Sequence, residues 1–221
     1  MSQERHDRHV AHEFNRAAKG YDESRTVKSY QRRTQILVIG KMQIGKGMNI
    51  LDLGCGTGQG TIDIASRLEG IGRVIGLDLS EKMVEQAQRK LGSIPYDNVE
   101  FGVGSGGSLD YDSTFDYVIS TNAFHHFRQK HAIFSRVWNS LKLGGVFMVQ
   151  DICDDYLLMR IVDLAGKIGE RAHVGSTTSE GLANLFRSSG FVNIEIDRVK
   201  INWFWRTMIG KGTRSANQAG G

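Results

Sequence analysis

A glycine-rich segment with one acid is the part of the sequence whose residue types point most directly to chemistry. The stretch ILDLGCGTGQG (50–60) places Asp52 two residues before the first of Gly54, Gly56 and Gly58, in an aliphatic run. Such glycines let a ligand contact main-chain N–H groups directly, near the positive end of the helix that follows. The segment therefore predicts a nucleotide-like ligand.

A second acid strengthens this prediction by its position. Asp78 ends the aliphatic run RVIGLD (73–78) and follows Gly58 by 20 residues, since 78 − 58 = 20. A carboxylate at this spacing can accept hydrogen bonds from both hydroxyls of a ribose. The alternative is purely structural: the glycines permit a tight turn, and Asp78 caps a helix that begins near Ser80.

The spacing of the glycines distinguishes between nucleotides. A dinucleotide fingerprint requires G-x-G-x-x-G, but Gln59 stands at the sixth position counted from Gly54, and Thr61 stands there counted from Gly56. This mismatch disfavours an NAD-dependent oxidoreductase, which stays open as an alternative.

Candidates for a general base follow two later aliphatic runs. His125 and His126 come after FDYVIS (115–120), and Asp151 ends GVFMVQD (145–151). A histidine titrates near neutral pH and could accept a proton from a hydroxyl or an acidic carbon. Adjacent histidines face different ways, so we expect at most one to act, with His125 ahead of His126. Structural hydrogen bonding is the alternative for both, and capping of a helix is the alternative for Asp151.

These residues must be positioned by alternating strands and helices. Strand-like runs cover 49–53, 73–78, 98–103, 115–120 and 145–151, and helix-periodic or polar segments separate them. Two further alternating runs, 191–199 and 200–210, lie too close together for a crossover helix and must be antiparallel. We predict an α/β, Rossmann-like, seven-stranded, mostly parallel sheet with helices on both faces and a C-terminal antiparallel hairpin.

The same patterns predict the organisation of the chain. Residues 1–45 are expected to form a helical cap over the sheet, 46–211 the ligand-binding domain, and 212–221 a disordered tail. At strand spacing, Trp203 and Trp205 share one face, which favours burial in the hairpin over a membrane or nucleic-acid surface. Thr177 and Glu180 have the spacing of a capping box for a late helix.

Composition limits the function classes. The 221 residues carry 28 Lys and Arg against 24 Asp and Glu, a net charge of +4, which is too small a bias to indicate nucleic acid. No run approaches the roughly 18 apolar residues of a membrane span, and the polar start does not resemble a signal peptide. Cys55 and Cys153 have no metal-binding or disulfide spacing. We expect a cytoplasmic protein without a metal, as a monomer or homodimer.

Five segments together resemble a known family. ILDLGCGTGQG, VIGLDLS, FDYVISTNAFHHF, LKLGGVFMVQD and LFRSSGFVNIEI closely resemble the class I S-adenosylmethionine (SAM) dependent methyltransferases, over roughly residues 45 to 209. Within that family, the chain looks like the small-molecule branch that includes the quinone-type (methyltransferase type 11) enzymes. The segment 14–33 is also similar to the start of carboxyl methyltransferases that act on a carrier-bound acid.

The resemblance implies a role for each matching residue. The loop glycines would admit the carboxypropyl part of SAM, Asp52 would neutralise its α-ammonium directly or through water, and Asp78 would hold the ribose. Leu79 would lie against adenine, with an ordinary core leucine as the alternative. Further expected cofactor contacts are Cys55, Gly104, Ser105, Gly106, Thr121 and Asn122, and Tyr21 could cover the cofactor or simply pack. The segment 152–175 is where this family usually builds a substrate lid, and plain packing is its alternative.

One position departs from the family pattern. Ser105 stands where an aspartate commonly binds the exocyclic amine of adenine, and Ser105 accepts a hydrogen bond more weakly than a carboxylate does. Either the affinity for SAM is modest or a main-chain carbonyl replaces the aspartate.

The resemblance therefore predicts transfer of a methyl group from SAM to a small-molecule or carrier-bound acceptor, with the O, N or C nucleophile unresolved. Such transfer mainly needs proximity and alignment. A SAM-binding protein without methyl transfer is the main alternative. No nucleic-acid partner and no membrane insertion are expected.

Overall fold

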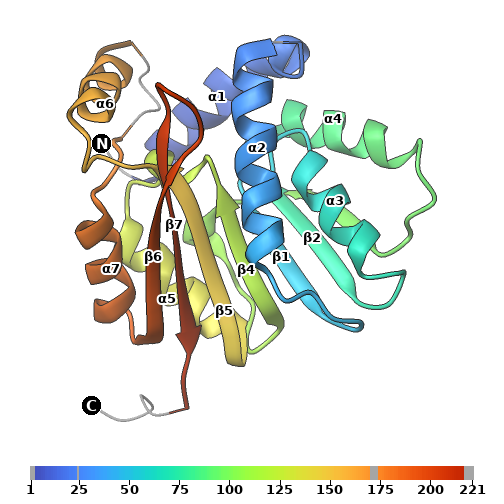
Figure 1. Ribbon diagram of the computed structural model, residues 1–221. Helices are drawn as coiled ribbons and strands as arrows, with labels where there is room; N and C mark the ends of the chain where they lie inside the picture. The colour runs from blue at the N-terminus through green and yellow to red at the C-terminus, as the bar shows by residue number, and fades with distance from the viewer. Residues whose placement is uncertain (1–2, 24, 170–173, 217–221) are drawn as a thin grey trace.

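A seven-stranded sheet forms the centre of the protein (Figure 1). The computed structural model describes residues 3–23, 25–169 and 174–216. The strand order is β3-β2-β1-β4-β5-β7-β6. The strands are β1 (Asn49–Leu53), β2 (Arg73–Asp78), β3 (Val99–Val103), β4 (Phe115–Thr121), β5 (Leu141–Ile152), β6 (Phe191–Lys200) and β7 (Arg206–Arg214). The first five strands run parallel, and β7 is antiparallel to both β5 and β6, which confirms the predicted fold class.

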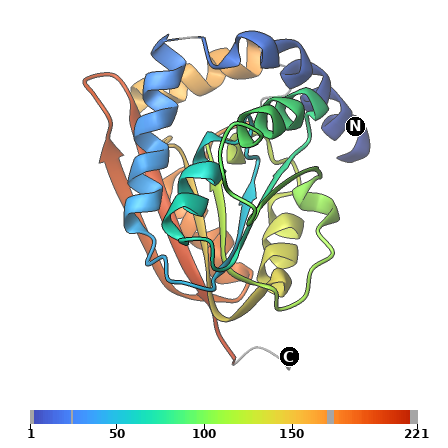
Figure 2. The same ribbon diagram turned by 90° about the vertical axis from the view of Figure 1, so that its right-hand side faces the viewer.

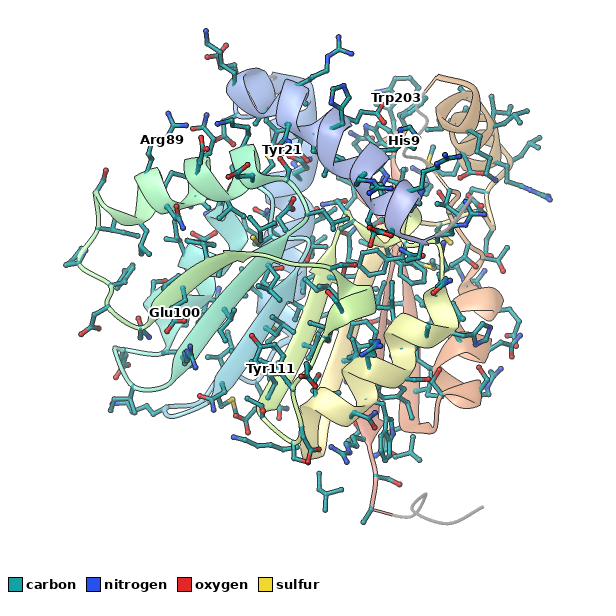
Figure 3. All side chains as sticks on the ribbon, turned by 180° about the vertical axis from the view of Figure 1, so that it is seen from behind. His9, Tyr21, Arg89, Glu100, Tyr111 and Trp203 are labelled. Carbon is teal, nitrogen blue, oxygen red and sulfur yellow. The ribbon has the colours of Figure 1, made fainter. Side chains whose placement is uncertain are left out.

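Helices cover both faces of this sheet (Figures 1 and 3). One face carries α2 (Arg25–Lys41), α3 (Gln59–Arg67) and α4 (Glu81–Leu91), and the other carries α5 (Lys130–Ser140) and α7 (Ser179–Ser188). The short helices η1 (Gly106–Ser108) and η2 (Phe124–His126) follow β3 and β4. The central strands are apolar because both of their faces are covered: four of the five β1 residues are buried.

Two further helices lie at the end of the sheet where the parallel strands finish (Figure 2). These are α1 (Gln3–Tyr21) and α6 (Leu157–Gly169). α1 is held against the start of α4, because the Asn15 side-chain carbonyl accepts hydrogen bonds from the Ser80 hydroxyl at 2.7 Å and the Lys82 main-chain N–H at 3.0 Å. The carboxyl ends of the strands, where open α/β sheets bind ligands, are thus roofed by the N-terminal part of the chain.

No helix within the described ranges has the length and apolarity that crossing a bilayer would require.

The last hairpin differs from the sequence prediction. Residues 201–205 form a turn, because the Asn202 side-chain oxygen accepts hydrogen bonds from the main-chain N–H groups of Phe204 and Trp205. Strand alternation therefore stops before the two tryptophans. Trp203 is 81% exposed, so its predicted burial is wrong, whereas Trp205 packs against Tyr30 with ring centroids 4.8 Å apart.

Two boundaries also change. The tail predicted at 212–221 begins too early, since β7 continues to Arg214, whose guanidinium lies over the Trp138 ring at 4.2 Å. Residues 217–221 lie outside the described part of the chain. The N-cap of α7 is Thr178, whose hydroxyl accepts from the Gly181 N–H, and not Thr177 as the spacing had predicted.

Candidate active site

The loop between β1 and α3 has a fixed shape. Gly54, Gly56 and Gly58 all adopt left-handed backbone conformations, with φ of +81°, +55° and +78°. The N–H groups of Gly54 and Cys55 both donate to the Leu77 carbonyl, at 2.8 and 3.0 Å, which ties the loop to the end of β2. Glycine tolerates these conformations at little steric cost, so the sequence and the turn agree.

The three glycines serve different purposes. A Cβ on Gly54 would lie 2.5 Å from the Ala123 Cβ, and a Cβ on Gly58 would lie 2.6 Å from the Phe101 ring. A Cβ on Gly56 would meet no protein atom within 4 Å, and Gly56 lines the main cavity. Packing therefore requires Gly54 and Gly58 to be glycines, whereas the space beside Gly56 is open to a ligand.

Asp78 is oriented by the main chain. One of its carboxylate oxygens accepts the Gly56 N–H at 2.9 Å, and the other accepts the Ser80 N–H at 2.8 Å. Burial raises the pKa of Asp78 above its usual value, and these two hydrogen bonds oppose the increase. A carboxylate has about four lone-pair positions, so Asp78 retains acceptor capacity toward the cavity that it lines.

Asp52 lies deeper, at 4% exposure. It accepts a hydrogen bond from the Thr61 hydroxyl at 2.6 Å, but burial raises its pKa to about 6. No cation contributes to that pKa. Asp52 borders a small hollow of about 10 Å³, which it shares with Gly54, Cys55 and Thr121. A hollow of this size is close to the minimum for one water molecule.

The main cavity, of about 190 Å³, opens beside the glycine loop. It brings together twelve of the residues predicted from the sequence: Tyr21, Gly54, Cys55, Gly56, Asp78, Leu79, Gly104, Ser105, Gly106, Thr121, Asn122 and His126. Four others, Asp52, Gly58, His125 and Asp151, are not among the residues that line it. Burial and the nearby acids raise the pKa of Cys55 well above its usual value, so this thiol stays neutral.

The sequence analysis missed most of the roof of this cavity. Eight such residues line it from the two N-terminal helices and the turn between them: Gln3, Asp7, Val10, Phe14, Asp22, Gln31, Arg32 and Gln35. Asp22 is tied to the opposite wall, accepting a hydrogen bond from the Thr57 hydroxyl at 2.9 Å and pairing with Lys90 at 2.7 Å. No sequence spacing relates these helices to the glycine loop. The one signal for their role was the similarity of segment 14–33 to the start of carboxyl methyltransferases.

Asp151 and His125 form a pair beside the cavity. The His125 ring Nδ1 lies 2.9 Å from the Asp151 carboxylate, which also accepts the main-chain N–H groups of His125 and Ile152, both at 2.7 Å. Asp151 is 1% exposed, and burial alone would raise its pKa. The attraction of His125 and these hydrogen bonds outweigh burial and lower the pKa below its usual value. The pair fastens the end of β4 to β5.

His126, and not His125, lines the cavity. Its ring stands edge-on to Phe14 with centroids 5.0 Å apart, and the His125 ring lies 4.0 Å away. Its main-chain carbonyl accepts a hydrogen bond from the buried His6 Nε2 at 2.8 Å, which attaches α1 to η2. The structure thus reverses the order expected from the sequence for access of the two histidines to a ligand.

The sheet order, the glycine loop at the end of β1 and the acid at the end of β2 define a Rossmann-like protein with a cavity at the carboxyl ends of its strands. Within that class, the chain belongs to the family described as "Methyltransferase domain", whose model matches residues 44–190. It is a class I methyltransferase with S-adenosylmethionine as its cofactor.

Individual relatives agree with this assignment. A demethylmenaquinone methyltransferase of a Geobacillus species is 26% identical over 89% of this chain and 93% of its own length. A phosphoethanolamine N-methyltransferase of Arabidopsis thaliana is 32% identical, but over only 51% of this chain and 23% of its own length.

Among solved structures, the chain resembles one assigned as a methyltransferase, in complex with the Haloferax volcanii Trm112 methyltransferase activator. Their TM-score is 0.77 at 21% identity, covering 92% of this chain and 98% of the other. A phosphoethanolamine N-methyltransferase of Haemonchus contortus in complex with SAM has a TM-score of 0.70 at 17% identity, covering 91% of this chain and 60% of the other. These two likenesses show a shared fold.

Proposed function

We propose that this protein transfers the methyl group of SAM to a small-molecule acceptor, and that a quinol ring is its first candidate substrate. The observation that carries the proposal is that Gly56, Asp78 and His126 line one cavity at the carboxyl ends of the strands. A nucleoside-binding wall and a proton acceptor therefore face the same space.

The residues present fit the cofactor. The space beside Gly56 is open, so a ligand can contact this part of the main chain. Asp78 is oriented to accept hydrogen bonds from ribose hydroxyls, and Leu79 offers an apolar surface beside it. Asn122, which also lines the cavity, has a buried side-chain oxygen for which no partner occurs in the described residues. Buried polar groups are normally satisfied, so this oxygen favours a bound polar ligand.

Asp52 would interact with the cofactor through water. It borders the small hollow and not the main cavity, and Gly54, Cys55 and Thr121 border both. A water in that hollow can bridge the buried carboxylate to an ammonium group in the main cavity. Pairing with a cation would offset the burial that raises the pKa of Asp52 to about 6.

When bound, SAM supplies an electrophilic methyl group on its sulfonium. The role of the chain is to align the acceptor and to exclude water, and Phe14 and Phe127 give the cavity aromatic walls for this purpose. The ring of His126 accepts a proton from an acceptor hydroxyl, which makes the acceptor more nucleophilic. Asp151 positions His126 indirectly. It holds the His125 ring, and the His126 ring lies against that ring.

Two features favour a quinol. Several relatives that align over most of their length are demethylmenaquinone methyltransferases, from Geobacillus, Lactococcus and another bacterium. The aromatic side chains of Phe14, Tyr21 and Phe127 also suit a flat aromatic acceptor. We assign residues 1–45 as the cap over this site and 152–175 as a lid, of which 170–173 lie outside the described residues.

The test is an acceptor assay. The protein is incubated with SAM and either demethylmenaquinone reduced to its quinol or phosphoethanolamine, and the products are measured by mass spectrometry. We expect S-adenosylhomocysteine and a methylated quinol in equal amounts, with neither formed by the Gly56→Val variant. Binding of SAM without methylation of any acceptor would instead favour a protein of this fold that lacks methyl transfer.

A further inference from the structure

The corner of the cavity beside η1 contains a carboxylate that comes from the N-terminal helix. Ser105, which follows β3 and precedes η1, donates its hydroxyl hydrogen to Asp7 of α1 at 2.9 Å and accepts the Gly107 N–H at 3.1 Å. The other Asp7 oxygen accepts a hydrogen bond from the Gln3 side chain at 2.6 Å. Asp7 and Ser105 both line the cavity, so these two residues, far apart in sequence, form one polar edge.

The walls next to this edge are apolar. Val10, Leu79, Met83 and Ile133 line the cavity from α1, the end of β2, α4 and α5. Gly106 between them cannot carry a side chain without approaching Leu53 and Ile133 within 3.0 and 3.1 Å. An apolar space with a carboxylate at its edge suits a flat ring that carries an N–H donor.

The other acids of the cavity are already assigned or paired. Among the described residues, three carboxylates line it: Asp7, Asp22 and Asp78. Asp22 pairs with Lys90 at 2.7 Å, and Asp78, which the Gly56 and Ser80 N–H groups orient, is assigned to the ribose under the proposed function. Asp7 accepts two hydrogen bonds from neutral groups, and a carboxylate has about four lone-pair positions. Asp7 is therefore the charged acceptor available to the base of the cofactor.

We propose that Asp7 accepts a hydrogen bond from the exocyclic amino group of the adenine of SAM, and that Ser105 orients the Asp7 carboxylate for this purpose. The proposal rests on SAM as the cofactor. It answers how adenine is recognised when position 105 is a serine: the carboxylate comes from α1 and not from the end of β3. Recognition of the base then requires α1 to lie against the sheet as it does here. The specificity for adenine therefore depends on closure of the N-terminal cap.

The seating of α1 does not depend on Asp7 alone. Asn15 accepts hydrogen bonds from Ser80 and Lys82 at the start of α4, and His6 donates to the His126 carbonyl. Replacing Asp7 therefore removes the carboxylate while the helix keeps its other attachments.

The experiment compares two ligands that differ along one edge of the base. S-adenosylhomocysteine has a 6-amino donor and an acceptor at N1, whereas S-inosylhomocysteine has a 6-oxygen acceptor and an N1–H donor. Asp7→Asn should lower the affinity for the adenosyl ligand about 10- to 100-fold, because a hydrogen bond to a charged group is lost. The inosyl ligand should bind to Asp7→Asn at least as tightly as it binds to the wild-type protein. The Asn amide can donate to the 6-oxygen and accept from N1–H, whereas the Asp carboxylate can only accept from N1–H. Titration calorimetry measures both affinities.

The control is Glu4→Gln, an exposed acid of the same helix that pairs with Arg8, and it should leave the preference between the ligands unchanged. A second variant, Ser105→Ala, leaves α1 intact and should lower the preference for the adenosyl ligand about 3- to 10-fold. Equal weakening of both ligands by Asp7→Asn, or an unchanged preference in both variants, would overturn the proposal. Failure of the wild-type protein to bind either ligand would instead count against the cofactor site itself.

Discussion

Two buried aspartates on central strands of the same sheet have opposite electrostatic situations. Asp52 on β1 is 4% exposed, no cation of the described residues contributes to its pKa, and burial raises that pKa to about 6. Asp151 on β5 is 1% exposed, but His125 and two main-chain N–H groups lower its pKa. The protein itself satisfies Asp151, whereas Asp52 remains without a charged partner. The difference indicates that a cationic ligand would bind near Asp52 on β1 and not near Asp151 on β5.

The same contrast extends to the neighbouring residues. Beside Asp52, the space next to Gly56 is open and the carboxylate of Asp78 keeps free acceptor capacity. Beside Asp151, the histidine ring and the ends of β4 and β5 are fastened together. We infer that the β1 and β2 side binds the cofactor, and that the β4 and β5 side holds the framework for the acceptor.

The largest expected effect is a loss of turnover, and it should distinguish the two histidines that follow β4. His126→Ala should lower turnover about 10²- to 10⁴-fold with little change in SAM affinity, because a general base acts only in the chemical step. His125→Ala should mainly lower the melting temperature, since it leaves Asp151 buried without its partner. Turnover and melting temperature of both variants, measured on the acceptor found in the assay above, decide this. Full turnover by His126→Ala would leave alignment alone as the mechanism.

The next effect concerns Asp151 itself. Asp151→Ala should lower the free energy of unfolding by about 3–5 kcal/mol, as expected when one partner of a buried ion pair is removed. Because the folded pKa is lowered, the contribution of Asp151 is present above its unfolded pKa and is lost as the pH falls through the folded pKa. Urea unfolding at pH 7 and pH 3 measures both. An unfolding free energy equal to that of wild type at pH 7 would contradict the pairing.

Glycine substitutions sharpen the comparison on the cofactor side. Gly56→Val should weaken SAM binding at least about 100-fold in a protein that remains folded. Its side chain fills space open to the ligand, and a β-branched residue is strained at the φ of +55° that the loop requires. Gly58→Val is the matched variant: its side chain meets Phe101 and Ala87, so loss of stability should dominate. Circular dichroism and calorimetry on the same samples distinguish these outcomes. Strong SAM binding by Gly56→Val would place the cofactor elsewhere.

The smallest expected effect is an increase in stability. Asp52→Asn should raise the free energy of unfolding at pH 7 by about 1–3 kcal/mol, because an ionised carboxylate with a raised pKa costs stability above that pKa. The gain should disappear as the pH falls from 6 to 4, where wild-type Asp52 becomes protonated in both states. SAM affinity should fall in the same variant. A loss of stability at pH 7 would show that the charge of Asp52 is satisfied without a ligand.

Local spacing explains which parts of this site could be predicted. Asp52, the glycines and Asp78 belong to one strand-loop-helix-strand unit, in which sequence separation fixes the geometry, and the structure brings Gly56 and Asp78 within 2.9 Å. The role of each glycine was not predictable, because it depends on Ala123 and Phe101, which come from other elements.

Contacts between distant segments explain the rest. Asp7 reaches Ser105 across 98 residues, and no periodic pattern encodes that distance. Which histidine lines the cavity depends on Asp151, one strand further on, since Asp151 binds the His125 ring and His125 does not line the cavity. In the hairpin, main-chain hydrogen bonds to the Asn202 side-chain oxygen interrupt the strand alternation, so the prediction for Trp203 was wrong.

The most direct test of the central claim is proton release when the cofactor binds. At pH 6, Asp52, with a pKa of about 6, is about half protonated, and pairing with the ammonium of the ligand should lower its pKa. Titration of S-adenosylhomocysteine in two buffers of different ionisation enthalpy counts the protons. We predict release of up to about half a proton at pH 6 and almost none at pH 8, with the release at pH 6 largely absent in Asp52→Asn. Equal proton release by wild type and Asp52→Asn at pH 6 would contradict the assignment of Asp52 to the cofactor.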